Sequence, residues 1–432
     1  MTSWTFSPFR VGGCLNAIPS KSEAHRVLIA AALADAPTNV VLNGFTSADI
    51  EATIRCIKAL GATVLPLKNC LHVIPGEIPA GQVAFDCGES GSTLRFMLPV
   101  AAARLKNGAE FIGAGRLPNR PLGELCDGLR ANGCNVSANS VPLAMTGRLT
   151  GGEFVLPGNV SSQYISGLLL ALPITQQGGS IRLVSQLEST DYVVMTIKVL
   201  ERFGIVVETL ADGWRVPGGQ SYHSPGTFAV EGDWSNAAAL LCAGAIDGSV
   251  TVSGLNVASA QGDRLIVEFL REFGVEVAVN GDSVTVSSRP LHGVTLDMSE
   301  NPDLFPVLAV LAAAADGRTV LANAARLRLK ECDRLSGMAE MLTAVGVHVT
   351  ETEDSLIIEG GVFHGEARAQ RGDARAPSRA DIKNDHRLVM AAALLSQVAN
   401  ADIEVDNVEA VNKSYPGFVE DWNRLERKEA LL

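Results

Sequence analysis

The hydrophobic positions of this chain repeat with a period of about 70 residues. In each period an amphipathic helical segment ends at a glycine and a short β-branched stretch follows. A glycine between a helix and a strand is typical of a helix end that needs a positive φ angle, with the strand starting at once, for example at 205–207. The repeated glycines, 70 to 72 residues apart, are Gly61, Gly133, Gly204, Gly274 and Gly346.

A second, alanine-rich helical segment recurs with the same period and precedes a polar turn and a strand. Its small side chains predict a helix that is buried on all sides. The six segments are residues 30–34, 98–105, 165–172, 237–245, 305–315 and 388–395. We therefore expect an α/β (α+β) protein built from six copies of a β-α-β-α-β-type unit.

The six copies predict two similar domains of three units each, because 432 residues exceed one ordinary core. The last copy has a helical segment at 418–427 but no strand after it. We infer that residues 4–11 supply this strand. One domain would then contain residues 1–14 and 228–432, and the other residues 15–227.

Unusual polar residues lie at the predicted starts of these helices. Ser47, Ser235 and Asp263 are interpreted as ordinary N-caps. Capping does not explain cations, which oppose the helix dipole at an N-terminus and therefore predict a polyanionic ligand. The cations are Lys21, Arg26, Arg120, Lys330, Arg334, Arg387 and Lys413.

The net charge of −12 argues against a nucleic-acid or acidic-membrane partner, although small anions could bind in a locally basic cleft. The eight cysteines form no CxxC pair and indicate buried thiols of a reducing compartment. The N-terminal residues have no signal-like pattern, and no apolar run reaches 18 residues. We expect a cytoplasmic protein.

Asp303 and Glu331, each at a predicted helix start near these cations, form a candidate acid/base pair. Either carboxylate could instead cap a helix or pair with a cation. His386, between Asp385 and Arg387, is either a proton carrier or a helix-start hydrogen-bonding group. The sequence has no GxxxxGK(S/T) loop, no GxGxxG after a strand and no HExxH, so nucleotide, dinucleotide and zinc chemistry have no support.

Eight motifs, in order from residue 21 to residue 416, resemble those of the 3-phosphoshikimate 1-carboxyvinyltransferase (EPSP synthase) family. They are Lys21-Ser22 with Arg26, Ser90 to Arg95, Asn119-Arg120-Pro121, Ser161-Ser162-Gln163, Pro302-Asp303, Lys330 to Arg334, Asn384 to Arg387, and Lys413 to Pro416. The resemblance implies an inside-out α/β barrel fold with a ligand cleft between the domains. It implies transfer of the enolpyruvyl group of phosphoenolpyruvate to the 5-hydroxyl of shikimate 3-phosphate, with release of phosphate, by a monomer that uses no metal or organic cofactor.

The resemblance also implies roles for individual residues. Proton transfer and catalysis would fall to Asp303, Glu331 and Lys21. Shikimate 3-phosphate would contact Lys21, Ser22, Arg26, Ser161, Ser162, Gln163, Ser189, Asp303 and Lys330. Phosphoenolpyruvate would contact Lys21, Gly91, Arg120, Gln163, Arg334, Arg387 and Lys413.

Glu89 and Arg326 depart from the family pattern, since Asn is common at both positions. They leave open the role of Arg326 and the fit of inhibitors near Gly91. One alternative is the related enolpyruvyl transferase that acts on UDP-N-acetylglucosamine, which typically carries a Cys before its Arg-Pro, whereas residues 113–121 contain none. Another is a non-catalytic anion-sensing protein, which would need the cations but not the acid/base pair.

Overall fold

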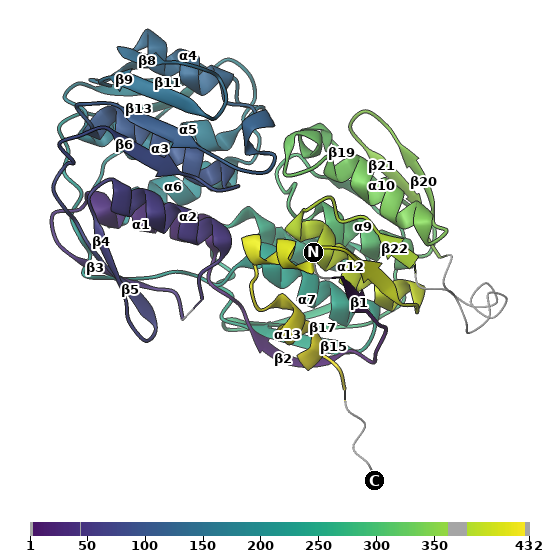
Figure 1. The fold of residues 1–432 in the computed structure, drawn as a ribbon. Coiled ribbons are helices and arrows are strands. Elements are labelled where there is room, and N and C mark those ends of the chain that lie inside the picture. Colours follow the sequence, from purple (N-terminus) through teal and green to yellow (C-terminus); the bar gives the residue numbers. More distant parts are fainter. Residues whose placement is uncertain (1–2, 44, 362–377, 428–432) are drawn as a thin grey trace. The chain divides into compact units, whose positions relative to one another are not determined.

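The computed structural model describes residues 3–43, 45–361 and 378–427 (Figure 1). The chain divides into two compact units, unit 1 with residues 1–18 and 231–432, and unit 2 with residues 19–230. The first division falls after residue 18, where residue 14 was expected, because β2 (Gly12–Asn16) pairs with β15 (Ser249–Ser253) of unit 1. The second falls after residue 230, where residue 227 was expected, because β14 (Thr227–Ala229) pairs with β3 (Thr38–Val41) of unit 2.

Five four-stranded sheets share one topology, in which a parallel strand pair is followed by two antiparallel neighbours. Unit 2 contains β14-β3-β5-β4, β6-β7-β9-β8 and β10-β11-β13-β12, and unit 1 contains β2-β15-β17-β16 and β18-β19-β21-β20. Their other strands are β4 (Thr63–Pro66), β5 (Cys70–Ile74), β6 (Val83–Asp86), β7 (Ala109–Ile112), β8 (Cys134–Val136), β9 (Leu143–Gly147), β10 (Gly152–Leu156), β11 (Gly178–Leu183), β12 (Glu208–Leu210), β13 (Gly213–Pro217), β16 (Glu276–Asn280), β17 (Ser283–Ser287), β18 (Thr295–Asp297), β19 (Arg318–Ala322), β20 (His348–Glu351) and β21 (Leu356–Glu359). This recurrence confirms the six-fold repeat in its first five copies.

The sixth sheet joins both ends of the chain. It contains β22 (Ser378–Ala380), β23 (Ile403–Val405) and β1 (Trp4–Phe6), and β1 pairs antiparallel with β23. Phe6 of β1 packs edge-on against Phe418 and Trp422 of α13 (Phe418–Arg424). The N-terminal strand thus completes the last sheet, while α13 ends three residues before the predicted residue 427.

Three helices form the centre of each unit, α1, α3 and α5 in unit 2 and α7, α9 and α12 in unit 1 (Figure 1). All ten residues of α9 are buried, and small residues let neighbouring helices approach closely, as where Gly167 of α5 meets the Arg95 carbonyl of α3. The prediction of fully buried alanine-rich helices is therefore confirmed for α9. The central helices are α1 (Lys21–Leu33), α3 (Gly91–Arg104), α5 (Ser162–Ala171), α7 (Trp234–Ile246), α9 (Phe305–Ala314) and α12 (His386–Ala399).

The outer helices end at the repeated glycines, whose φ angles of 78° to 111° confirm the predicted positive values. One predicted strand is wrong. Residues 205–207 are not a strand, and β12 begins only at Glu208, because the Val206 N–H and C=O bond to the Gln220 side chain instead of to a neighbouring strand. The outer helices are α2 (Ala48–Ala59), α4 (Gly123–Ala131), α6 (Thr190–Arg202), α8 (Ile266–Glu272) and α10 (Arg334–Ala344).

Each unit has its own hydrophobic core, built around its central helices. All eight cysteines are free and six are buried as predicted, whereas Cys14 is exposed and Cys70 is partly exposed. Among the helices that the structure describes, none combines the length and apolar character needed to cross a membrane.

Candidate functional site

Arg334, the first residue of α10, organises a carboxylate–arginine cluster in unit 1. Its side chain is 1% exposed, and its Nη1 donates to Asp303 Oδ1 at 2.8 Å. Its Nη2 donates to Glu331 Oε2 and its Nε to Asp385 Oδ2, each also at 2.8 Å. The structure thus brings together Asp303 and Glu331, the predicted acid/base pair, although neither of them caps a helix.

Asp303 lies two residues before α9, whose N-cap position belongs to Leu304. Its carboxylate also contacts Arg387 Nη2 at 3.4 Å and Lys330 Nζ at 3.7 Å. Burial opposes ionisation of this carboxyl, but Lys330, Arg387 and Arg334 outweigh burial and hold its pKa well below the usual range. Asp303 is therefore ionised and surrounded by three cations.

At Lys330 burial has the larger effect on the pKa. Burial lowers the pKa of its ammonium to about 8, although Asp303 favours the charged form. Arg334 behaves differently, because Asp385, Glu331 and Asp303 outweigh its burial and raise its pKa well above the usual value. Two guanidinium groups, those of Arg334 and Arg387, thus lie beside Asp303 together with an amine that can exchange a proton near neutral pH.

Arg387 and Lys413 complete the cationic side chains around this cluster. Arg387 Nη1 donates to the Ser235 carbonyl at the start of α7, and its buried Nε has no hydrogen-bond partner among the described residues. Lys413 Nζ donates to the Asn384 carbonyl at 2.7 Å. The Asp385 carboxylate caps α12 by accepting the Arg387 backbone N–H, so the same residue orients the helix and holds Arg334.

Three of the seven predicted helix-start cations are placed differently from the expectation. Arg120 and Lys330 follow short 3-10 helices, η1 (Leu117–Asn119) and η4 (Ala325–Leu329), and Lys413 ends η5 (Val408–Lys413). Lys330 and Glu331 therefore precede α10 rather than forming its first turn. Cations suit the C-terminal end of a helical turn, so at these three positions the helix dipole alone does not require an anion.

Two of the three predicted N-caps are also wrong. Ser47 caps α2 as expected, since its Oγ accepts the Ile50 N–H. Asp233, not Ser235, caps α7. Asp263 lies in η3 (Gly262–Leu265) and caps no helix; its carboxylate accepts the Ser235 hydroxyl and the Asn301 amide.

In unit 2, the first turn of α1 places Lys21 and Ser22 at one helix start. Ser20 caps this helix, and Lys21 Nζ donates to Asp49 Oδ2 of α2 at 2.9 Å. Both charged side chains are mostly buried. Lys21 and Asp49 therefore form a mostly buried ion pair between the starts of α1 and α2.

The starts of α3 and α5 are joined by a hydrogen-bonded bridge. Gln163 accepts from Arg95 Nη1 at 2.7 Å and donates to Ser92 Oγ at 2.8 Å. Ser161 caps α5 and Ser162 is its first residue, both of them buried. The predicted site residues of these two helices are thus held together through side chains.

Gly91 begins α3 beneath the guanidinium of Arg120. A Cβ atom at Gly91 would lie 2.6 Å from Arg120 Nη1, so glycine is what allows this close approach. A helix start and a cation therefore lie side by side here, and together they suit a phosphate or carboxylate.

Arg26 and Ser189 are more deeply embedded. Arg26 is buried inside unit 2, and its guanidinium bonds to Thr196, to Ser166 and to the Tyr192 carbonyl. Burial lowers its pKa to about 10. Ser189 is buried with a φ angle of 56° directly before α6. In this structure Arg26 fastens α1 to α5 and α6.

The two departures from the family pattern lie beside predicted site residues. The Glu89 carboxylate packs against Gly115 in the loop that leads to Arg120. Arg326 lies in η4, and its charge contributes to the lowered pKa of Lys330. A cation at position 326 therefore acts on the cluster electrostatically.

Four polar groups that hold the site had no predicted role in it: Asp49, Arg95, Asp263 and Asp385. Asp385 is fully buried and reaches Arg334 across 51 positions of the chain. It stands in the motif Asn384 to Arg387, which gives no indication of its partner, and its neighbour His386 is buried at the first position of α12. These partners depend on packing between helices and have no local pattern.

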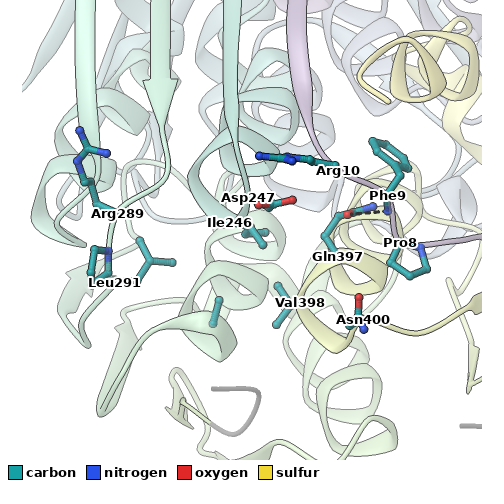
Figure 2. Close-up of a pocket in the computed structure, with 12 residues that line it drawn as sticks. Pro8, Phe9, Arg10, Ile246, Asp247, Arg289, Leu291, Gln397, Val398 and Asn400 are labelled. Atoms are coloured by element: carbon teal, nitrogen blue, oxygen red, sulfur yellow. Dashed lines mark hydrogen bonds between the residues drawn. The ribbon is translucent and has the colours of Figure 1, made fainter. Parts of the chain in front are cut away.

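A cavity of about 610 Å³ lies at the other ends of the same three central helices (Figure 2). Ile246, Ala314 and Val398 line it where α7, α9 and α12 end, and Arg10 and Asp247 add charged groups. Helix C-termini carry negative partial charge, whereas the cluster lies at the positive N-termini. An anionic substrate therefore suits the end of the central helices where the cluster lies, and not the end where this cavity lies.

Comparisons with known proteins agree with the fold. The enolpyruvyl transferase NikO from Streptomyces tendae superposes with a TM-score of 0.76 at 20% identity and covers 98% of this chain and 96% of its own. EPSP synthase from Acinetobacter baumannii superposes with a TM-score of 0.80 at 26% identity and covers 99% and 98%. The six-unit, two-domain architecture is therefore that of the enolpyruvyl transferases.

A family model described as EPSP synthase (3-phosphoshikimate 1-carboxyvinyltransferase) matches residues 7–422. The 3-phosphoshikimate 1-carboxyvinyltransferase of Clostridium novyi is 37% identical over 430 residues, covering 97% of this chain and 96% of the relative. That of Halobacterium salinarum is 39% identical over 433 residues, covering 96% and 97%. The chain belongs to the EPSP synthase family.

Proposed function

We propose that the carboxylate–arginine cluster carries the proton transfers of an enolpyruvyl transfer. As a member of this family, the chain is an enzyme that moves the enolpyruvyl group of phosphoenolpyruvate to the 5-hydroxyl of shikimate 3-phosphate in the shikimate pathway. The observation that supports a catalytic role for the cluster is the ionised Asp303 among Arg334, Arg387 and Lys330.

The reaction requires three proton movements. The 5-hydroxyl attacks C2 of phosphoenolpyruvate and loses its proton, C3 gains a proton, and a tetrahedral intermediate forms. C3 then loses a proton as the C–O bond to phosphate breaks, which restores the double bond in the product. Asp303, ionised in the resting enzyme, takes the hydroxyl proton, while Glu331 and Lys21 serve C3 and the leaving phosphate.

Phosphoenolpyruvate carries a carboxylate and a phosphate, and guanidinium groups bind both ions with paired hydrogen bonds. We assign this substrate to Lys21, Gly91, Arg120, Gln163, Arg334, Arg387 and Lys413. An anion on Arg334 and Arg387 would weaken their hold on Asp303 and raise its basicity when substrate is present.

Shikimate 3-phosphate is assigned to Lys21, Ser22, Arg26, Ser161, Ser162, Gln163, Ser189, Asp303 and Lys330. Ser161, Ser162 and Gln163 support this assignment because they form the start of a helix, where N–H groups and hydroxyls can hold a phosphate. Arg26 contributes through the position of α1, since its own donors bond within unit 2.

Acceptor choice tests this function. Incubation with phosphoenolpyruvate and equal amounts of shikimate 3-phosphate and UDP-N-acetylglucosamine should give, by mass spectrometry, the enolpyruvyl product of shikimate 3-phosphate only. Product on the nucleotide sugar would assign the chain to the related reaction.

We further propose a cytoplasmic monomer, for which sedimentation should give the mass of a single chain.

Gly91→Ala should raise the KM for phosphoenolpyruvate by about tenfold, because the added methyl group displaces the Arg120 guanidinium and costs about one charged hydrogen bond. The KM for shikimate 3-phosphate should stay within a few-fold. Gly81→Ala is the matched control in unit 2, since nothing lies within 4 Å of the added atom. An unchanged KM for phosphoenolpyruvate would remove the Gly91–Arg120 contact from its site.

Asp263→Asn should change how stability depends on pH. Burial, with Asp303 nearby, raises the pKa of Asp263 from 3.8 to about 6, so its ionisation destabilises the folded protein as pH rises through that window. The variant should therefore gain roughly 3 kcal/mol of unfolding free energy relative to the parent between pH 4 and pH 7, at about 1.4 kcal/mol per pKa unit. Urea unfolding of both proteins measures it, and a constant difference would contradict the raised pKa.

A further inference from the structure

A chain of buried hydrogen bonds crosses three helices of unit 2. His25 Nδ1 of α1 lies 2.6 Å from Thr53 Oγ1 of α2, which lies 2.7 Å from Thr93 Oγ1 of α3. Thr93 Oγ1 donates to Ser90 Oγ at 2.8 Å. His25, Thr53 and Thr93 are completely buried and Ser90 is 1% exposed. The chain ends on the N-cap of α3, directly before Gly91.

The direction of this chain follows from counting protons. A threonine hydroxyl has one hydrogen, and that of Thr93 goes to Ser90. Thr53 must therefore donate to Thr93, which leaves its lone pair to accept from His25. The Nδ1 atom of His25 consequently carries the proton, and its Nε2 atom is bare.

The surroundings of the ring fit this tautomer. Nε2 is buried and has no hydrogen-bond partner among the residues that the structure describes, and the ring meets Phe96 edge-on. Burial, together with the charges of Lys21 and Arg26, lowers the pKa of His25 well below its usual value. The imidazole is thus a neutral, fixed donor, because a second proton on Nε2 would have no acceptor.

We infer that His25 is a positioning residue for phosphoenolpyruvate binding, acting through Thr53 and Thr93 on the first turn of α3. Ser90 Oγ also accepts the Thr93 backbone N–H, at 3.2 Å, so the hydroxyl chain and the helix cap share one atom. If that atom shifts, the start of α3 shifts with it. Gly91, the first residue of α3, then changes its position against the Arg120 guanidinium. The inference rests on the proposed role of Gly91 and Arg120 for this substrate.

Thr53→Val tests the inference, because it removes the central hydroxyl and nearly preserves side-chain shape. The KM for phosphoenolpyruvate should rise about tenfold, while kcat and the KM for shikimate 3-phosphate stay within about threefold, a tenfold change being the effect of one charged hydrogen bond. Thr175→Val is the matched control: Thr175 is also buried in unit 2 and hydrogen-bonded, but its partners are Leu172 and Gly178. It should lower stability without changing either KM.

Nitrogen-15 NMR of the imidazole supplies a readout that does not depend on activity. The parent should show His25 with its proton on Nδ1, and Thr53→Val should release this preference. If Thr53→Val does not fold, two variants of His25 provide the test instead. His25→Asn should keep the parent KM for phosphoenolpyruvate, since the asparagine amide can donate from near the Nδ1 position. His25→Leu should raise that KM.

An unchanged KM for phosphoenolpyruvate in a folded chain-breaking variant overturns the inference, as does an equal rise in Thr175→Val. A proton on Nε2 in the parent overturns the direction of the chain. A parent enzyme that does not use phosphoenolpyruvate would instead refute the proposed function, and the NMR result would still decide the tautomer.

Discussion

Asp303→Asn is expected to lower kcat by 10² to 10⁴-fold, on the order of the contribution of a general base. Asn preserves an oxygen that can accept from Arg334 Nη1 but cannot take the proton of the attacking hydroxyl. Steady-state phosphate release at saturating substrates measures the change. The binding constant for shikimate 3-phosphate should remain within about tenfold, which separates chemistry from binding.

Loss of stability alone is a competing explanation, because Asp303 at neutral pH has three cationic neighbours. Asp421→Asn is the matched control, since Asp421 is a buried carboxylate of unit 1 that bonds to Tyr415 and Arg424. It should reduce stability and leave kcat nearly unchanged. If Asp303→Asn kept kcat within a few-fold of the parent, Asp303 would not be the base and Glu331 would be the next candidate.

Arg334→Lys should be severe although it conserves charge. One guanidinium donates to Asp303, Glu331 and Asp385 from three different nitrogens, and a single ammonium cannot reach all of them. The unfolding free energy should fall by about 3 to 5 kcal/mol, the cost of breaking a buried pair, and kcat/KM for phosphoenolpyruvate should fall by about 100-fold or more.

Arg271→Lys provides the comparison, because Arg271 pairs with Glu268 at 3.0 Å on an exposed surface of the same unit. Its effect on the unfolding free energy should be below about 1 kcal/mol. Urea denaturation and kinetics of both variants decide the matter. A loss at Arg334 as small as that at Arg271 would show that the three carboxylates do not depend on the guanidinium.

Much of the fold could be predicted because its signals are local. Spacing of apolar residues reports which face of a helix is buried, and a glycine at a helix end reports a positive φ, as at Gly61 and Gly346. The exact starts of helices could not be predicted where a 3-10 turn comes first, as before Lys330, because so short a turn has no periodicity of its own. Around Val206 the sequence is β-branched, which predicts a strand, but the Val206 backbone N–H bonds to the side chain of Gln220 instead.

The candidate site was predictable in its chemistry and not in its geometry. Cations at predicted helix starts indicate an anionic ligand. Only packing shows that Arg26 bonds within unit 2, whereas Arg334 holds both Asp303 and Glu331. The identity of the two substrates came from ordered motifs over most of the chain, since charge alone does not separate one phosphate ester from another. Asp385 was missed because its partner is distant in sequence.

The most direct test of the account is phosphate release measured against both substrates together. With phosphoenolpyruvate and shikimate 3-phosphate present, the purified parent chain should release phosphate in a one-to-one ratio with enolpyruvyl product, and with either substrate alone it should release none. Asp303→Asn should abolish nearly all of this release while still binding shikimate 3-phosphate. Phosphate released without the acceptor, or no release with both substrates, would contradict an enolpyruvyl transfer carried out by this cluster.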